Sequence, residues 1–134
     1  MNLELAGCVI LDRNKKIYLL HRNDKGFTQW ELPGGKVGQD ETVEQTALRE
    51  LNEELGVKVK IVRQLGRTAF LENETTHEYT WFLAEIESGD LKICEPEKFD
   101  DLRSFSFDEL STLELSNNMK KLYEAMKIGA ISLS

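Results

Sequence analysis

The segment Gly35–Val57, GKVGQDETVEQTALRELNEELGV, decides the fold of this chain. Within it, Thr42 and Gln45 stand three residues apart, in the form of a capping box that begins a helix. Gly56 stands where a helix end favours a residue that tolerates left-handed backbone geometry. The segment therefore predicts a helix over about residues 43–55.

The two sides of this helix differ in chemistry. At about 100° per residue, three glutamates fall within one arc of about 100°, and three leucines fall together on another side. The glutamates are Glu50, Glu53 and Glu54, and the leucines are Leu48, Leu51 and Leu55. We expect the leucines to pack on the core and the glutamates to form a carboxylate face.

Crowded carboxylates repel one another, so a cation is expected among them. Oxygen ligands without a nearby Cys or His favour a hard cation, Mg²⁺ first and Mn²⁺ second. Arg49 adjoins this face and is placed to hold a glutamate through a bidentate pair. The alternative is a solvated acidic face, which is how most glutamate-rich helices are used.

The whole segment fits the pattern G-x5-E-x7-R-E-U-x-E-E-x-G-U, where U is aliphatic, at every fixed place. The fixed places are Gly35, Glu41, Arg49, Glu50, Leu51, Glu53, Glu54, Gly56 and Val57. This pattern resembles the box of the Nudix hydrolases, and the resemblance extends to residues 30–35, 95–98 and 105–110. It implies an α/β (α+β) fold, an α/β/α sandwich with a mixed β-sheet, in a single domain over residues 1–134.

The family reaction is hydrolysis of a nucleoside diphosphate linked to another group, by attack of water on phosphorus. Carried over by motif position, the implied metal ligands are Glu50, Glu53, Glu54 and a backbone carbonyl of Gly34 or Gly35. A bound divalent cation would draw off developing charge and supply a usable water near neutral pH.

One carboxylate must then accept a proton from the attacking water. Glu53 is the expected base, and Glu50 shares its catalytic face. Glu97, in a loop outside the box, is a second candidate as base or extra ligand, and a solvated loop acid is the alternative reading. Arg49 and Glu41 are expected to hold these acids in place.

Four further residues are candidates for substrate contact. Lys36 and Arg22 suit a phosphate, although Arg22 is equally well explained as a surface charge. Trp30 is placed to stack on a base, although aromatic residues in strands more often belong to the core. Asn118, or its neighbour Asn117, is placed to bond a base edge, although helix-start polarity is the simpler explanation. Two other aromatic candidates are Phe27 and Tyr79.

The segment Glu95–Lys98, EPEK, resembles the MutT-like branch of the family, and residues 72–75 lack the marks of two other branches. We therefore expect a Mg²⁺-dependent pyrophosphohydrolase that converts (d)NTPs or modified nucleoside triphosphates to NMP and pyrophosphate. One alternative is a hydrolase of ADP-ribose, dinucleoside polyphosphates or nucleotide sugars. Another is a non-catalytic nucleotide-sensing module, against which the retention of every box glutamate counts.

The composition fits an enzyme that acts on small nucleotides. A net charge of -7 and a pI near 4.9 argue against broad binding to nucleic-acid polymers or membranes, because nothing offsets phosphate repulsion. Cys8 and Cys94 are expected to be buried free thiols, and no signal pattern is apparent, so a cytoplasmic location is expected. A monomer or a homodimer is compatible with the sequence.

The rest of the chain predicts strands and one further helix. Strands are expected at residues 3–11 and 16–21, paired with each other, followed by a loop over residues 23–29. A final helix is expected from a Ser116 cap to about Lys127. The other expected elements are strands at 57–62, 68–71, 78–86 and 102–107 and a turn at 73–76.

Overall fold

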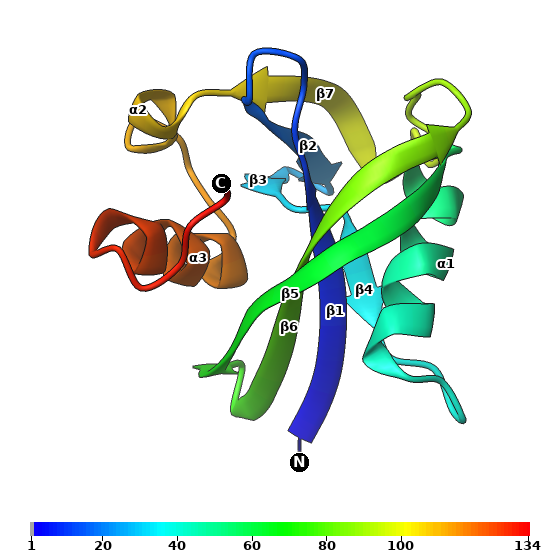
Figure 1. Cartoon of the computed structure of the whole chain (residues 1–134). Helices are drawn as coiled ribbons and strands as arrows, with labels where there is room; N and C mark the ends of the chain where they lie inside the picture. The colour runs from blue at the N-terminus through cyan, green and yellow to red at the C-terminus, as the bar shows by residue number, and fades with distance from the viewer. Residues whose placement is uncertain (1) are drawn as a thin grey trace.

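A computed structural model describes residues 2–134 as two β-sheets and three helices (Figure 1). In chain order the elements are β1 (Asn2–Ile10), β2 (Ile17–Asp24), β3 (Phe27–Glu31), β4 (Gly34–Lys36), α1 (Val43–Leu55), β5 (Lys58–Glu72), β6 (Thr75–Ser88), β7 (Phe99–Phe105), α2 (Phe107–Leu110) and α3 (Asn117–Lys127). None of the helices in this part of the chain is long and apolar enough to cross a membrane.

The larger sheet is mixed, with strand order β4-β1-β6-β5. Strand β1 runs parallel to β6, whereas the β1–β4 and β5–β6 pairs are antiparallel. The smaller sheet has the order β3-β2-β7 and is antiparallel throughout. Helix α1 lies on one side of the sheets, and α2 and α3 lie on the other (Figure 1). The predicted α/β/α sandwich with a mixed sheet is confirmed.

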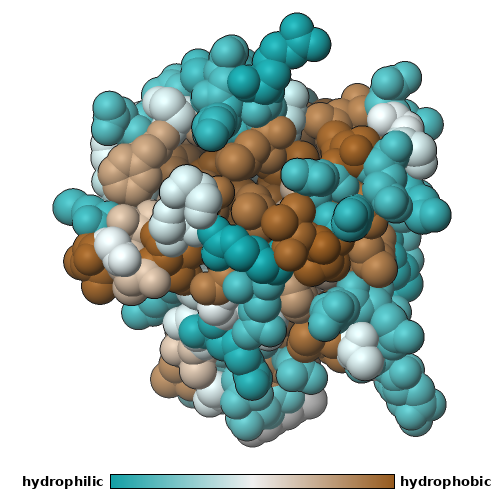
Figure 2. Space-filling model, in the orientation of Figure 1, coloured by the Kyte–Doolittle hydropathy of each residue, from teal (hydrophilic) through white to brown (hydrophobic). Residues whose placement is uncertain are grey.

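Two hydrophobic clusters hold these layers together. One cluster packs Leu51 and Leu55 of α1 against strand residues that include Phe82. The other packs Met119 and Leu122 of α3 with residues of the opposite sheet face. On the face viewed in Figure 1, apolar surface gathers across the middle and upper part of the molecule, above the tip of the β5–β6 hairpin (Figure 2). Each helix is therefore fixed to the sheets by its own apolar side.

Helix α1 has the predicted bounds and caps. The side chains of Thr42 and Gln45 each accept a hydrogen bond from the backbone N–H of the other, and Gly56 adopts a left-handed φ of 71°. Leu48 is 39% exposed, contrary to expectation, whereas Ala47 is fully buried. The reason is that the core-facing residues repeat every four positions from Ala47, which leaves Leu48 turned to one side.

The first two strands do not pair as predicted, because both edges of β1 are occupied by β4 and β6. An isolated bridge between Leu11, the residue after β1, and Ile17 connects the two segments. Residues 23–29, expected to form a loop, instead form the β2–β3 hairpin. Its two-residue turn is made by Lys25 and Gly26, whose φ values of 53° and 83° suit such a connection.

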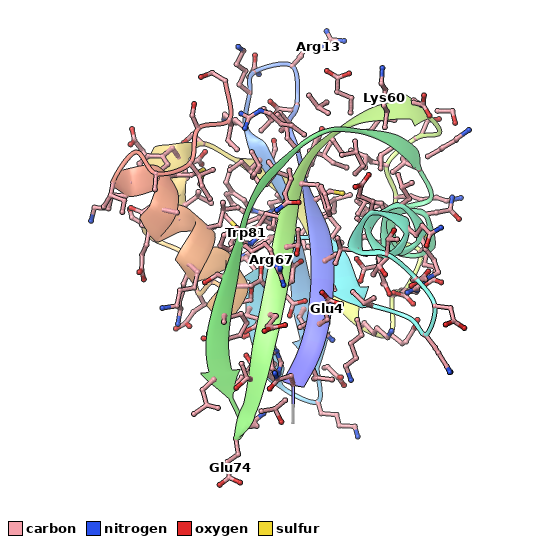
Figure 3. The ribbon with its side chains drawn as sticks, turned by 60° about the horizontal axis from the view of Figure 1, so that its bottom comes forward. Glu4, Arg13, Lys60, Arg67, Glu74 and Trp81 are labelled. Carbon is pink, nitrogen blue, oxygen red and sulfur yellow. The ribbon has the colours of Figure 1, made fainter. Side chains whose placement is uncertain are left out.

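The β5–β6 hairpin is longer than the sequence predicted. The expected strands at 57–62 and 68–71 form one strand, β5, whose pairing with β6 shifts register at three places. Strand β5 is an edge of the larger sheet, and its exposed basic residues are Lys58, Lys60, Arg63 and Arg67. The turn consists of Asn73 and Glu74, with φ values of 51° and 66°. Figure 3 shows Glu74 at the hairpin tip, pointing away from the molecule.

The region before α3 also differs from the prediction. Strand β7 ends at Phe105, and Ser106 with Glu109 forms a capping box that begins the short helix α2. The sequence SFDE carries the signal for this helix. Helix α3 begins after its Ser116 cap, as predicted. Cys8 is buried as expected, but Cys94 is exposed because it lies in the irregular segment between β6 and β7.

Candidate active site

Strand β4 brings two glycines against the carboxylates of α1. The N–H of Gly34 donates a hydrogen bond of 2.8 Å to Oε1 of Glu54. A Cβ added at Gly35 would lie 2.5 Å from the carboxyl carbon of Glu50, so this carboxylate lies directly on the glycine backbone. Any larger residue at position 35 would displace Glu50.

Burial changes the protonation of both carboxyls. Glu54 is only 5% exposed, and desolvation raises its pKa well above the usual value, opposed by the Gly34 hydrogen bond. Desolvation also raises the pKa of Glu50, opposed by Arg49. The charge of Glu95 contributes to both increases. These acids therefore lie in a region that favours a positive ion or a proton.

Arg49 anchors the acids of the box. Its Nε and Nη2 donate to the two carboxylate oxygens of Glu41, at 2.7 and 2.9 Å, which is the expected bidentate pair. Its Nη1 donates to Glu50 at 2.9 Å and to Glu53 at 3.2 Å. Hydrogen bonds led by that from Arg49 lower the pKa of Glu41 to about 2. One guanidinium thus orients three carboxylates at once.

A cavity of about 940 Å³ opens beside Glu50 and Glu54, a volume in the range of small-molecule sites. One group of lining residues comes from β4 and α1, and a second comes from the β5–β6 hairpin and the start of α3. The first group is Gly34, Gly35, Lys36, Glu50 and Glu54. The second is Phe70, Glu72, Asn73, His77, Asn117, Asn118 and Lys120. The cavity therefore joins an acidic wall to a mixed aromatic and polar wall.

Several residues predicted from the sequence meet at this cavity, and others lie beside it. The lining includes Arg22, Gly35, Lys36, Glu50, Glu54 and Asn118. Arg49, Glu53 and Glu97 are not part of that lining. Glu53 lies on the same helix with 47% of its side chain exposed. The buried Oδ1 of Asn118 has no hydrogen-bond partner in the described part of the chain.

Trp30 points away from the cavity. Its ring packs against His21 and Phe105, with centroids 4.7 and 4.8 Å apart. Alternation along β3 instead directs its neighbours Gln29 and Glu31 to the cavity. The base stacking expected of Trp30 has no support from this placement.

Arg22 is held in place by its neighbours. Its Nε and Nη2 donate to the carboxylate of Glu31 at 2.6 and 3.1 Å, and its guanidinium lies 5.0 Å from the centroid of the Phe99 ring. The hydrogen bond to Glu31 raises the pKa of Arg22. Arg22 is therefore a fixed cation on the cavity wall, and neither this pair nor Glu31 was predicted.

The donor set at the acidic wall suits a hard divalent cation. Among residues 2–134, no three His, Cys, Asp or Glu side chains already converge as a metal cage, and Arg49 holds Glu50 and Glu53. However, among the described residues the buried Glu54 carboxylate is bonded by the Gly34 N–H alone, and Glu50 lies close enough for its charge to act on Glu54. Carboxylate and carbonyl oxygens of this kind are the ligands that Mg²⁺ and Mn²⁺ prefer.

The fold places the protein in a recognised structural class. It superposes on the MutT protein of Methanosarcina mazei Go1 with a TM-score of 0.82 and 21% identity, covering 94% of this chain and 93% of that one. This class is the MutT-type sandwich. At 21% identity, the two proteins are shown to share a fold and nothing more. The sequence profile of the NUDIX domain matches residues 1–126, and the chain belongs to this family.

Two relatives with named activities are similar to this chain in sequence. The 8-oxo-dGTP diphosphatase of Proteus vulgaris is 44% identical over 61 residues, which span 42% of this chain and 53% of that protein. An RNA pyrophosphohydrolase of Erythrobacter litoralis is 27% identical over 130 residues, which span 82% of this chain and 79% of that protein. This chain thus matches only about half the length of the first relative.

Proposed function

We propose that this chain, as a single domain over residues 1–134, is a divalent-cation-dependent pyrophosphohydrolase of (d)NTPs or modified nucleoside triphosphates. The observation that carries the proposal is the pair of partly desolvated carboxylates, Glu50 and Glu54, on the wall of a nucleotide-sized cavity. The similarity to an 8-oxo-dGTP diphosphatase supports a triphosphate substrate. The products are NMP and pyrophosphate.

The proposed ligands of Mg²⁺, or of Mn²⁺, are Glu50, Glu53, Glu54 and a backbone carbonyl of Gly34 or Gly35. When bound, the cation supplies charge neutralisation for the phosphates and lowers the pKa of water. Arg49 holds Glu50 and Glu53 in orientation, and Gly34 holds Glu54. The chain therefore fixes its acids through one guanidinium and one backbone N–H.

The reaction adds one water across a phosphoric anhydride bond. The water oxygen bonds to phosphorus, the bridging P–O bond breaks, and the water proton passes to a carboxylate. Glu53 is the proposed base because it lies on the acidic face and remains half-exposed beside Arg49. The loop acid Glu97 was the second candidate from the sequence, and we now prefer Glu95 of the same loop, because its charge acts on both Glu50 and Glu54.

Substrate contacts are proposed from the cationic and polar residues of the cavity. Lys36 follows the glycines on β4 and is placed to meet a phosphate, as is Arg22 beside Glu31. Asn118, whose buried Oδ1 has no partner in residues 2–134, is proposed to meet the base. We further propose a cytoplasmic protein, monomeric or homodimeric, that acts on free nucleotides and on neither nucleic-acid polymers nor membranes.

A product panel tests this proposal. The purified chain is incubated with Mg²⁺ and each of (d)NTPs, 8-oxo-dGTP, ADP-ribose, a dinucleoside polyphosphate, a nucleotide sugar and a 5′-triphosphorylated RNA. Pyrophosphate and NMP from a triphosphate are the expected products. Turnover of ADP-ribose alone, or of the RNA alone, would move the protein to another substrate class. Binding without turnover of any compound would identify the sensing module instead.

A further inference from the structure

The phenol of Tyr79 crosses from β6 over β1 to β4. A Cβ added at Gly7 would lie 2.1 Å from the Tyr79 hydroxyl oxygen, and one added at Gly34 would lie 2.5 Å from it. Gly7 and Gly34 are paired across β1 and β4. The hydroxyl therefore occupies a slot between two glycine backbones that no other residue type would leave open.

This slot lies at the acidic wall of the cavity. Gly34, which borders the hydroxyl, is the residue whose N–H binds Glu54. Tyr79 itself lines the cavity although only 3% of the residue is exposed. The phenol thus reaches the place where the proposed cation and the phosphates would meet.

No hydrogen bond joins the Tyr79 hydroxyl to another group of residues 2–134, and the hydroxyl is not among the fully buried polar atoms that lack a partner. It therefore keeps some contact with the cavity that Tyr79 lines. A buried phenol usually finds a partner, because an unmade hydrogen bond at a desolvated group is costly. The charged groups around it are Glu54, Glu50 and Glu31. No hydrogen bond joins these acids to the phenol, so within residues 2–134 the O–H is a donor without an acceptor, on a residue that lines the cavity.

We propose that Tyr79 is a substrate-binding residue whose O–H donates a hydrogen bond to a phosphate oxygen of the bound nucleotide. This inference rests on the proposed function and deepens it, because it assigns one donor to the phosphate chain at the acidic wall. A phosphate is favoured over the base, since the hydroxyl borders Gly34, whose N–H binds Glu54, whereas Phe70 and His77 belong to the other wall.

The test compares Tyr79→Phe with Tyr123→Phe as a matched control. The ring of Tyr123 stacks on Phe107 outside the cavity lining, so loss of its hydroxyl should leave activity unchanged. Tyr79→Phe should fold with a Tm equal to or above that of the wild type, because the ring and its packing remain and an unpartnered hydroxyl is removed. It should lower kcat/KM for the best triphosphate by about 10- to 100-fold, the range for a hydrogen bond to a charged group.

Two further measurements separate a phosphate contact from a sugar contact. Binding of Mg²⁺ and inorganic tripolyphosphate, which has neither sugar nor base, should weaken by a similar factor in Tyr79→Phe. The loss in kcat/KM should also be equal for an NTP and its dNTP. A loss confined to the NTP would overturn the phosphate assignment in favour of the ribose 2′-hydroxyl.

The outcomes also separate this inference from the proposed function. A wild-type chain that cleaves triphosphates while Tyr79→Phe matches it within about twofold, in both turnover and tripolyphosphate binding, would overturn the role of Tyr79 alone. A wild-type chain that cleaves no triphosphate would overturn the proposed function, and tripolyphosphate binding would then still decide whether Tyr79 contacts phosphate.

Discussion

Gly34 and Glu54 stand 20 residues apart in the chain and are joined by a hydrogen bond of 2.8 Å from the glycine N–H to the carboxylate Oε1. The bond ties the last turn of α1 to the short strand β4, and both elements also pack on β1. It fixes the orientation of a buried acid without neutralising it. The Gly34 N–H therefore orients the carboxylate that we propose as a cation ligand.

The first prediction concerns Glu54→Gln. Because Glu54 has a raised pKa, the metal-free folded state retains a proton that the unfolded state releases near its usual value of 4.5. The free energy of unfolding of the metal-free wild type should thus fall as pH rises above that value. The free energy of unfolding of Glu54→Gln should fall less over the same range. Thermal unfolding from pH 5 to 8 in EDTA measures this difference.

Addition of Mg²⁺ to the same samples tests the metal site. Saturating Mg²⁺ should raise the wild-type Tm by about 5 °C or more, and Glu54→Gln should lose most of that increase. Glu44→Gln, a change at an exposed acid in the first turn of the same helix, is the control and should keep it. Equal Mg²⁺ responses in all three proteins would remove Glu54 from the ligand set.

The second prediction concerns the general base. Glu53→Gln should lower kcat by about 10²-fold or more, because general-base assistance is worth at least that factor. The side chain is 47% exposed, so the Tm should change little. Steady-state kinetics on the best triphosphate give the answer, and a kcat within a few fold of wild type would assign the proton transfer to another acid.

The third prediction compares the two acids of the EPEK loop. Burial is the main cause of the raised pKa of Glu50 and of Glu54, and the charge of Glu95 adds to both increases, which places Glu95 near the acidic wall. Glu95→Gln should therefore reduce kcat by about 10-fold or more, and Glu97→Gln by about twofold at most. Each variant serves as the control for the other. The reverse order of effects would restore Glu97 as the functional loop acid.

The fourth prediction concerns Glu41 and acid stability. Hydrogen bonds, first that of Arg49, lower the pKa of Glu41 to about 2 in the folded state, against 4.5 for the free group. The stability from this pair is fully present above pH 4.5 and is lost as pH falls towards about 2. Glu41→Gln should thus be less stable than the wild type at pH 7. The two Tm values should converge as pH falls towards about 2. Parallel Tm curves over this range would contradict the assignment.

The fifth prediction concerns the tip of the β5–β6 hairpin. Asn73 and Glu74 both have positive φ, and a side chain in that conformation costs about 1 kcal/mol. Asn-Gly is the preferred pair for such a turn. Glu74→Gly should therefore stabilise the protein by about 1 kcal/mol in urea unfolding. Glu74→Ala, which keeps a Cβ, should give no such gain.

Local sequence signals predicted helix α1 and the acidic face well. The capping box at Thr42, the left-handed Gly56 and the spacing of the box glutamates are short-range features that one segment specifies by itself. A bidentate pair between Arg49 and a glutamate could be anticipated, because Arg49 and Glu41 both belong to that segment. The signal for α2, in Ser106 and Glu109, was equally local and was overlooked.

Long-range pairing was much less predictable. Strand β1 belongs to the larger sheet, whereas β2 belongs to the smaller one. Which strands pair depends on which strand edges remain free, and no local sequence pattern specifies this. For the same reason the sequence did not indicate that Trp30 faces away from the cavity, or that Tyr79 reaches Gly34 from another strand. These side chains acquire their roles only when distant strands are aligned.

The shape of β5 has a consequence for how copies of this protein meet. An exposed sheet edge can accept a strand from another molecule and so begin aggregation. Here that edge is interrupted by three register shifts and carries several exposed lysines and arginines. Both features discourage strand addition. We therefore expect that any homodimer is built on a surface other than a sheet continued across β5.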